Sequence, residues 1–254
     1  MTMLTGTAVG IDIGGTGIKG APVDLGAGTL ITERVRLLTP SPATPKKVAA
    51  IVAELTDRIG VPGPLGLTLP AVVTGGVVRT AANIDNSWIG VDAVELFGAA
   101  TGRPVVVVND ADAAGTAEVR FGAGVGCSGV VVVVTLGTGI GSALFVNGVL
   151  VPNTEFGHLP LHHGDAEQWA ADSARERDDL SWEQYAHRLE RYFELIQRLL
   201  WPDLIIVGGG VSKKAEKYLP LIDVGTRVVP ASLLNDAGIV GAALAAARTD
   251  PAAG

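Results

Sequence analysis

Residues 9–20 read VGIDIGGTGIKG, and they carry the strongest signal for the fold of this chain. An apolar run rich in β-branched residues leads to Asp12, and a glycine-rich turn then leads into a second apolar run, so the pattern predicts a β-hairpin. Glycine tolerates positive φ and lets backbone N–H groups approach an anion, while a threonine supplies a hydroxyl and a lysine a positive charge. The turn therefore predicts a phosphate-binding loop, whose ligands would be Gly14, Gly15, Thr16 and Lys19.

The same pattern recurs at residues 130–145, which read VVVVVTLGTGIGSALF. A strand with the character of a buried one runs into a Gly-Thr-Gly turn, and a second strand leads to the turn signal Asn147-Gly148. Two such hairpins, one in each half, indicate a duplicated fold that holds one phosphate chain, with Thr138 and Gly139 at the second loop. A Rossmann fold would need GxGxxG followed by a helix, and neither turn is followed by a helical pattern.

Composition limits the class of protein. The chain has 254 residues, of which 48% are hydrophobic and 34 are glycine, which suits one compact unit or two small lobes. A single cysteine, Cys127, excludes an internal disulfide, and no apolar run is long enough to span a membrane. Residues 1–6 lack the basic region of a signal peptide, so we expect a cytoplasmic protein without a membrane partner.

Net charge narrows the possible partners. The value of −7 argues against broad nucleic-acid binding, which depends on basic surface, but it leaves a polyanionic substrate open. A local basic cluster would suffice for that, and its candidates are Lys19, Arg79, Lys213, Lys214 and Lys217. For the last three, a solvated helix face is the alternative.

Periodicity predicts two α/β lobes. The first, residues 1–109, has a third strand at 30–38, a helix at 45–59 with Thr44 as N-cap, and strands at 65–69 and 105–108 around a helix at 91–100. The second, residues 110–254, has its hairpin, a strand at 204–207 and helices at 111–120, 166–175, 182–200 and 237–247. A further helix follows the glycine stretch after the strand at 204–207 and ends at Tyr218. The last helix can pack back on the first lobe.

Asp110 is the candidate general base. It follows the strand at 105–108 directly, at the carboxyl end where open α/β sheets bind ligands. Phosphoryl transfer to a hydroxyl needs a carboxylate that accepts the hydroxyl proton. The alternative is that Asp110 only caps the helix that follows, and the residues alone leave both roles open.

Further polar residues suit a sugar. Glu155 and His158 lie three apart, and a carboxylate with an imidazole can hydrogen-bond vicinal hydroxyls, although a satisfied, partly buried histidine is the alternative. Asn83 and Asn109 are amide candidates for the same sugar, with turn formation as their alternative. Asp12 suits Mg²⁺, held directly or through water, with turn capping as its alternative.

Five motifs in order resemble a known family. The two phosphate loops resemble those of the sugar-kinase, actin and Hsp70 superfamily, and more narrowly those of the ROK family of bacterial sugar kinases and repressors. Within that family, TAANIDNSWIG at 80–90, NDADAAG at 109–115 and EFGHL at 155–159 resemble the polyphosphate glucokinases. The resemblance implies a two-lobed actin-like ATPase (ribonuclease H-like) fold, with duplicated βββαβαβα lobes and mixed sheets, and it implies a homodimer.

The resemblance also implies roles for residues. Asp110 would be the base, Asp12 would position Mg²⁺, and the sugar would be bound by Asn83, Asn109, Asp110, Glu155, His158 and Glu167. The family's adenosine-facing loop would correspond to Gly208, Gly209, Gly210 and Val211, for which an ordinary strand-to-helix turn is the alternative.

One departure from the family concerns zinc. Many ROK proteins follow the Glu-x-Gly-His segment with a cysteine-rich zinc site, whereas residues 159–165 read LPLHHGD here. His158, His162, His163 and Asp165 could bind zinc in principle, but their irregular spacing lacks the usual signature, so we expect no zinc.

The expected activity is transfer of the terminal phosphoryl group of inorganic polyphosphate, and of ATP, to the 6-hydroxyl of glucose. Acceptance of mannose and the preferred donor stay open. One alternative is a strictly ATP-dependent ROK hexokinase. Another is a sugar-responsive ROK repressor, which would carry a helix-turn-helix module where only eight residues precede Val9. A third is an actin-type ATPase without a sugar.

Overall fold

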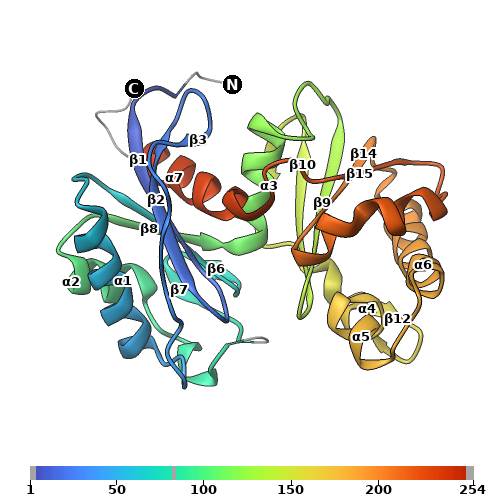
Figure 1. Ribbon diagram of the computed structural model, residues 1–254, viewed down its shortest axis with the longest axis horizontal. Helices are drawn as coiled ribbons and strands as arrows, with labels where there is room; N and C mark the ends of the chain where they lie inside the picture. The colour runs from blue at the N-terminus through green and yellow to red at the C-terminus, as the bar shows by residue number, and fades with distance from the viewer. Residues whose placement is uncertain (1–3, 82–83, 250–254) are drawn as a thin grey trace. The chain divides into compact units, whose positions relative to one another are not determined.

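The computed structural model describes residues 4–81 and 84–249, which form two compact units. The first unit runs to Ala117 and resumes at Asp236, and the second is the continuous segment Glu118–Asn235 (Figure 1). Helix α3, Asp110–Phe121, runs from the first into the second. Among the described residues, no helix combines the length and the apolar character needed to cross a bilayer.

The first unit is a mixed sheet covered by helices on both faces. Its strand order is β3-β2-β1-β5-β8, and β4 also pairs with β2. The β1–β2 pair is antiparallel, whereas β1, β5 and β8 run parallel. The strands are β1 (Thr7–Ile13), β2 (Ile18–Asp24), β3 (Thr29–Leu30), β4 (Val35–Leu37), β5 (Leu65–Leu69) and β8 (Val105–Asn109), beside a small ribbon of β6 (Val73–Thr74) and β7 (Val77–Val78).

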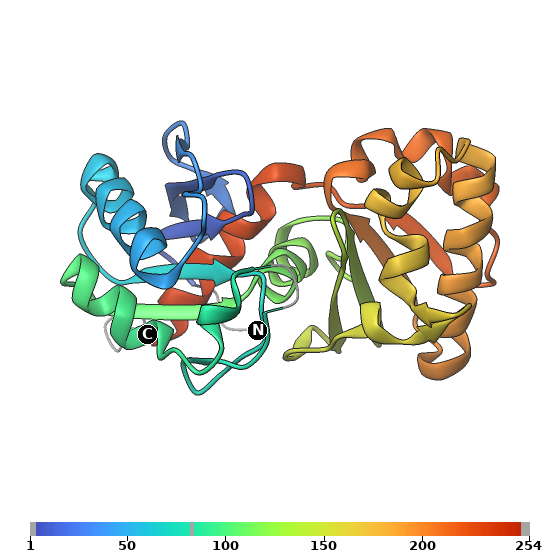
Figure 2. The ribbon, with the colours of Figure 1, turned by 90° about the horizontal axis from the view of Figure 1, so that it is seen from below.

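Alternating side chains of β1 face the two helical layers. Ile11 and its odd-numbered neighbours join a core with Val52 and Leu55 of α1, Pro45–Ile59, which lies with α2, Ala93–Thr101, on one side of the sheet (Figures 1 and 2). On the other side, α7, Ala237–Thr249, packs on β1, β5 and β8. The last helix thus completes the core of the first unit.

Two glycines let α7 lie directly on this sheet. Gly10 and Gly66 are register partners on adjacent strands, and a Cβ on Gly10 would overlap the carbonyl oxygen of Ile239. A Cβ on Gly66 would likewise overlap the carbonyl oxygen of Ala242. Because no side chain stands between them, the backbones of helix and sheet are in direct contact.

The second unit repeats this plan. Its strand order is β11-β10-β9-β14-β15, in which β9–β10 and β10–β11 are antiparallel pairs and β9, β14 and β15 run parallel. The strands are β9 (Val130–Leu136), β10 (Ile140–Val146), β11 (Val149–Val151), β14 (Leu204–Gly208) and β15 (Arg227–Pro230), with a ribbon of β12 (Pro160–Leu161) and β13 (Gly164–Asp165). The duplication predicted from the two hairpins is confirmed.

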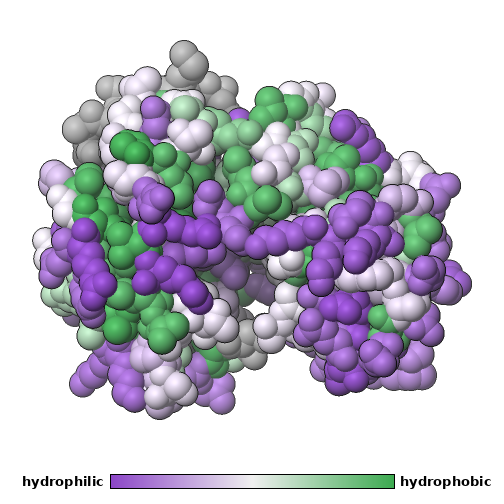
Figure 3. All heavy atoms as spheres, in the orientation of Figure 1, coloured by the Kyte–Doolittle hydropathy of each residue, from purple (hydrophilic) through white to green (hydrophobic). Residues whose placement is uncertain are grey.

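Helices cover both faces of this sheet too. Val132 and Val134 face the core formed with α6, Trp182–Leu200, while Val131 and Val133 pack with Val119 at the end of α3. The shorter helices of this unit are α4 (Ala166–Ala170) and α5 (Asp172–Arg177). The 3₁₀ helices are Asn86–Trp88 in the first unit, followed along the chain by Phe156–His158, Gly210–Lys217, Leu219–Leu221 and Leu234–Asp236. Figure 3 shows hydrophilic residues gathered over the α4–α5 region.

Asp178 joins α5 to α6. Its carboxylate accepts hydrogen bonds from Arg177 at 2.8 Å and from Arg188 at 2.7 Å. These two hydrogen bonds lower the pKa of Asp178 to about 2, so the carboxylate stays ionised over the range in which enzymes work.

Four expectations about the fold differ from the structure. The single strand expected at 30–38 is two short strands, because Pro22 on β2 has no N–H to donate and the chain loops out between β3 and β4. The helix expected at 166–175 breaks at Ala171, whose extended ψ of 162° ends α4 and starts α5. The segment ending at Tyr218 is a 3₁₀ helix. The boundary expected after Asn109 falls at the start of α3, whereas the first unit keeps this helix as far as Ala117.

The last difference has a steric basis within the first unit. A Cβ on Gly241 of α7 would overlap the carbonyl oxygen of Ala113, so α7 and the first turns of α3 are in backbone contact. This contact holds the start of α3 with the first unit.

Candidate active site

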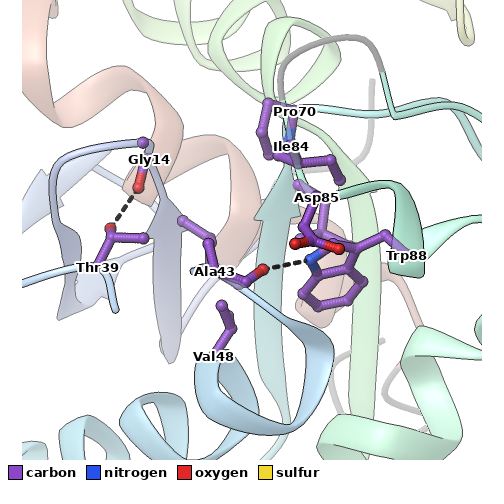
Figure 4. A pocket seen from close by; sticks show the side chains of 11 residues that line it. Gly14, Thr39, Ala43, Val48, Pro70, Ile84, Asp85 and Trp88 are labelled. Atoms are coloured by element: carbon purple, nitrogen blue, oxygen red, sulfur yellow. Dashed lines mark hydrogen bonds between the residues drawn. The ribbon is translucent and has the colours of Figure 1, made fainter. Parts of the chain in front are cut away.

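The first phosphate loop is a tight turn between β1 and β2. Gly14 N–H donates to the carbonyl oxygen of Gly17 at 3.1 Å, and the Thr39 hydroxyl donates to the carbonyl oxygen of Gly14 at 2.5 Å (Figure 4). Gly15 and Thr16 are exposed, and their N–H groups donate to no residue that the structure describes. Two backbone amides that have no partner among the described residues suit an anion, and phosphate binding by this loop stays a prediction.

The second phosphate loop, between β9 and β10, is built alike. Gly137 N–H donates to the carbonyl oxygen of Gly139 at 3.0 Å, and the side chain of Thr138 is exposed. Ser173 of α5 fixes this loop from outside, since its N–H donates to the Gly137 carbonyl at 3.1 Å and its hydroxyl to the Thr138 carbonyl at 2.5 Å. Each loop is thus closed by one backbone hydrogen bond and anchored by a hydroxyl from another segment.

Asp12 lies at the end of β1 and is held from three sides. Its Oδ1 accepts from the Thr68 hydroxyl at 2.8 Å, and its Oδ2 lies 3.0 Å from Lys19 Nζ. A Cβ on Gly238 of α7 would lie 2.8 Å from Asp12 Cγ, so the carboxylate fills the space that this glycine leaves. The side chain keeps 17% of its surface exposed, which leaves the carboxylate accessible beside the phosphate loop.

Asp110 and Asn109 divide the capping of α3. The side-chain oxygen of Asn109 accepts from Ala111 N–H at 2.8 Å and from Asp112 N–H at 3.0 Å, and its amide donates to the Ala71 carbonyl at 3.2 Å. Asn109 is therefore a helix cap with one hydrogen left for any sugar. Asp110 Oδ1 also accepts from Ala111 N–H at 2.9 Å. Because Asn109 caps the helix, the cap does not depend on Asp110 alone.

Glu155 and His158 lie on one 3₁₀ turn of the second unit. His158 Nε2 lies 3.8 Å from Glu155 Oε2, and its Nδ1 lies 3.1 Å from Asp165 Oδ2. The ring is 42% exposed between two carboxylates. Sequence reasoning gave Asp165 no such role, because only the pairing of β12 with β13 brings it to the histidine.

Glu167 connects this pair to the second phosphate loop. Its Oε2 accepts from the N–H of Ile140, the residue directly after that loop, at 3.2 Å. Burial raises the pKa of Glu155, with His158 opposing the shift and the nearby Glu167 carboxylate adding to it. Glu155, His158 and Glu167 thus share one region of the second unit.

The glycine stretch after β14 has one structural and one open position. Gly209 has φ of 83°, and a Cβ there would overlap the backbone of Leu136, so the fold requires glycine. Gly210 is exposed, and a Cβ there would meet no atom within 4 Å, whereas Gly208 is buried in the strand. The side chain of Val211 packs in the core, which leaves only its backbone for a nucleotide.

A cavity of about 310 Å³ adjoins the first phosphate loop. Gly14, Thr39, Asp85 and Trp88 contribute to its wall, and Trp88 Nε1 donates to the Ala43 carbonyl at 2.9 Å (Figure 4). The cavity therefore lies behind the hydroxyl that anchors the loop. Asn83, predicted to bind the sugar, lies outside the described residues.

The basic side chains considered for binding a polyanion have different surroundings. Lys19 lies at the first phosphate loop, and Arg79 donates to Thr74 on the β6–β7 ribbon. The Nζ atoms of Lys214 and Lys217 each lie 5.6 Å from the ring centroid of Trp182. Lys19 therefore adjoins the first phosphate loop, through its ion pair with Asp12.

His162 and His163 lie side by side with ring centroids 4.2 Å apart, and His162 stacks on Trp169. In the part of the chain that the structure describes, no group of three or more His, Cys, Asp or Glu side chains is arranged so that it could hold a metal ion.

Comparison with known proteins gives consistent results. The ROK family profile matches residues 8–176. A polyphosphate glucokinase of Mycobacterium tuberculosis is 55% identical over 237 residues, 93% of this chain and 89% of that protein. The crystal structure of the inorganic polyphosphate/ATP-glucomannokinase from Arthrobacter sp. strain KM superposes with a TM-score of 0.92 at 53% identity, covering 97% of this chain and all of that one.

A more distant structure shares the fold. The ROK family glucokinase from Streptomyces griseus, solved in complex with glucose and AMPPNP, superposes with a TM-score of 0.82 at 26% identity, over 94% of this chain and 99% of that one. The actin-like ATPase fold that the family resemblance implies is the fold of these neighbours, and the chain shares it.

Proposed function

The chain belongs to the ROK family, and on this basis we propose that it is a polyphosphate glucokinase. It transfers the terminal phosphoryl group of inorganic polyphosphate, and of ATP, to the 6-hydroxyl of glucose. The observation that carries the proposal is the 55% identity to the M. tuberculosis polyphosphate glucokinase over 93% of the chain. Five motifs predicted from sequence support it.

The second unit offers ligands for the sugar. Asp165 hydrogen-bonds Nδ1 of His158, which leaves Nε2 to hydrogen-bond a sugar hydroxyl. Glu155, ionised above its raised pKa, accepts from a neighbouring hydroxyl. Glu167 connects these groups to the second phosphate loop, because its carboxylate accepts a hydrogen bond from Ile140 N–H. The sugar is thereby oriented for reaction.

The first unit offers the base. Asp110 accepts the proton of the sugar's 6-hydroxyl while the hydroxyl oxygen bonds to the terminal phosphorus of the donor. The bond between that phosphorus and the bridging oxygen breaks, which leaves a donor one phosphate shorter. The N–H groups of Gly15 and Thr16 hold phosphate oxygens in one unit, and Thr138 and Gly139 do so in the other. Asn109 keeps Asp110 at the helix start through its cap.

Asp12 suits Mg²⁺ held through water. Both of its oxygens already have partners, Thr68 and Lys19, yet the carboxylate stays partly exposed, and Mg²⁺ commonly keeps several waters while using one or two carboxylates. The bound ion supplies positive charge that offsets the charge developing on the phosphates.

Finer features belong to the same proposal. The name of the Arthrobacter structural neighbour, a glucomannokinase that uses polyphosphate or ATP, supports acceptance of mannose and of both donors. The open surface at Gly210 leaves room for an adenosine. A homodimer and a cytoplasmic location are proposed with them, without a nucleic-acid or membrane partner.

The test is glucose phosphorylation with Mg²⁺, comparing long-chain polyphosphate with ATP at matched concentrations of terminal phosphate. Turnover with polyphosphate at least equal to that with ATP supports the proposal. Turnover with ATP alone assigns a strictly ATP-dependent hexokinase, and glucose-independent ATP hydrolysis without transfer assigns an ATPase.

A further inference from the structure

We propose that Arg36 of β4 binds the phosphate chain of the donor and extends the first phosphate loop. The inference rests on the proposed function and names a further subsite of the same donor-binding region. The ligand class is a linear phosphoanhydride, the chemistry that polyphosphate and ATP share.

Arg36 covers the loop with its guanidinium group. A Cβ on Gly17 would lie 2.5 Å from Arg36 Nε and 3.1 Å from its Cζ, and Gly17 is buried although it belongs to an exposed turn. Glycine at this position therefore lets a cationic side chain lie against the backbone of the loop. Phosphate oxygens bound by Gly15 and Thr16 would lie next to this guanidinium.

Most of the hydrogen-bonding capacity of Arg36 is unused. A guanidinium has five N–H donors, and the structure gives this one a single long bond, from Nη2 to the Thr16 carbonyl at 3.4 Å. Among the described residues, no carboxylate pairs with it, whereas Arg34, two residues earlier, lies 2.7 Å from Asp236. An exposed guanidinium fork without a carboxylate suits bidentate contact with phosphate oxygens.

Strand register places Arg36 in a row with the charges already described. Asp12 is opposite Lys19 on β2, and Lys19 is opposite Arg36 on β4, so all three side chains project from the same face of the sheet. Adjacent strands lie about 4.8 Å apart, so the backbones of Asp12 and Arg36 are roughly 10 Å apart across the sheet. Two cations and one carboxylate give this row a net positive charge.

The other direction of the row leads to the base. Asp12 is opposite Thr68 on β5, and Thr68 is opposite Val108 on β8, two residues before Asp110. Arg36 and Asp110 therefore lie on opposite sides of the first phosphate loop. When the terminal phosphate of the donor lies at Asp110, Arg36 contacts phosphates further along the chain, which are not transferred.

The experiment compares wild type with Arg36→Gln, Arg36→Lys and the charge-matched control Arg58→Gln, whose side chain pairs with Glu54 on α1. Loss of a charged hydrogen bond raises the donor KM roughly 10- to 100-fold in Arg36→Gln, with less effect in Arg36→Lys and none in Arg58→Gln. Glucose KM and Tm stay at their wild-type values. A rise in KM for polyphosphate alone places Arg36 beyond the third phosphate, counted from the one transferred. An equal rise in KM for ATP places Arg36 at one of the first three phosphates.

Direct binding of polyphosphate separates contact from a structural role. Each cation that neutralises a phosphate releases counterions, so the slope of log Kd against log salt falls by about 0.7–0.9 when one contact is lost. An unchanged slope, or a rise in glucose KM equal to that in donor KM, overturns the assignment. Wild-type protein that transfers phosphate from neither donor refutes the proposed function instead, since that result does not involve Arg36.

Discussion

Replacing Thr39 by valine removes the hydroxyl that anchors the first phosphate loop and leaves a side chain of nearly the same shape. The lost hydrogen bond, 2.5 Å from the Gly14 carbonyl, is worth about 0.5–1.5 kcal/mol net, and a carbonyl left without its donor costs about 1–3 kcal/mol where water cannot replace it. Gly14 is only partly buried, so we expect the lower part of this range, about 1–2 kcal/mol. If that energy is lost from donor binding, the donor KM rises about 5- to 30-fold.

The assay measures KM for polyphosphate, ATP and glucose, together with Tm, in Thr39→Val and in Thr39→Ser. Serine keeps the hydroxyl and should keep the wild-type donor KM, because only the methyl group is lost. A donor KM in Thr39→Val within twofold of wild type would contradict this role of the hydroxyl, and so would an equal rise in glucose KM, since the hydrogen bond of Thr39 is to the phosphate loop.

Three further predictions concern other positions. Asp110→Asn keeps the oxygen that accepts the backbone hydrogen bond but loses the base, so turnover falls about 10²- to 10⁴-fold with Tm unchanged, and near-normal turnover contradicts the role. The pKa of Glu155 is raised in the folded protein, so its contribution to the stability is present below the ordinary pKa of a glutamate and is lost as pH rises through the raised pKa. Glu155→Gln removes this pH dependence from Tm. In the wild type, glucose KM rises as pH falls through the same range, because the protonated carboxyl no longer accepts from the sugar hydroxyl. Gly66→Ala forces a Cβ into the Ala242 carbonyl and lowers the free energy of unfolding by about 3 kcal/mol in urea titrations. Gly98→Ala, whose Cβ has ordinary contacts, should show no loss, and equal stability of the two variants would contradict the packing.

Much of the fold could be predicted because its signals are local. The helix at Pro45–Ile59 and the helix at Trp182–Leu200 have the predicted bounds, since apolar spacing and a capping residue lie in the same short window. Both hairpins were predictable for the same reason, because a β-branched run and a glycine turn are adjacent in sequence.

The rest depends on register and pairing, which no short window contains. Arg36 reaches Gly17 only because β4 pairs with β2, and Asp165 reaches His158 only because β12 pairs with β13. The cap of α3 involves Asn109, where the sequence left Asp110 as the alternative, because both residue types accept backbone N–H groups equally well.

The backbone contact between α7 and the first sheet sets an order of assembly during synthesis. The second unit, Glu118–Asn235, is one continuous segment and has all its strands once Asn235 has left the ribosome. The first unit waits for Ala237–Thr249, although its sheet was made first. At about 5–20 residues per second, that sheet keeps the glycine-lined face at Gly10 and Gly66 uncovered for roughly 7 to 28 seconds. The half of the chain that is translated first is thus the last to complete its core.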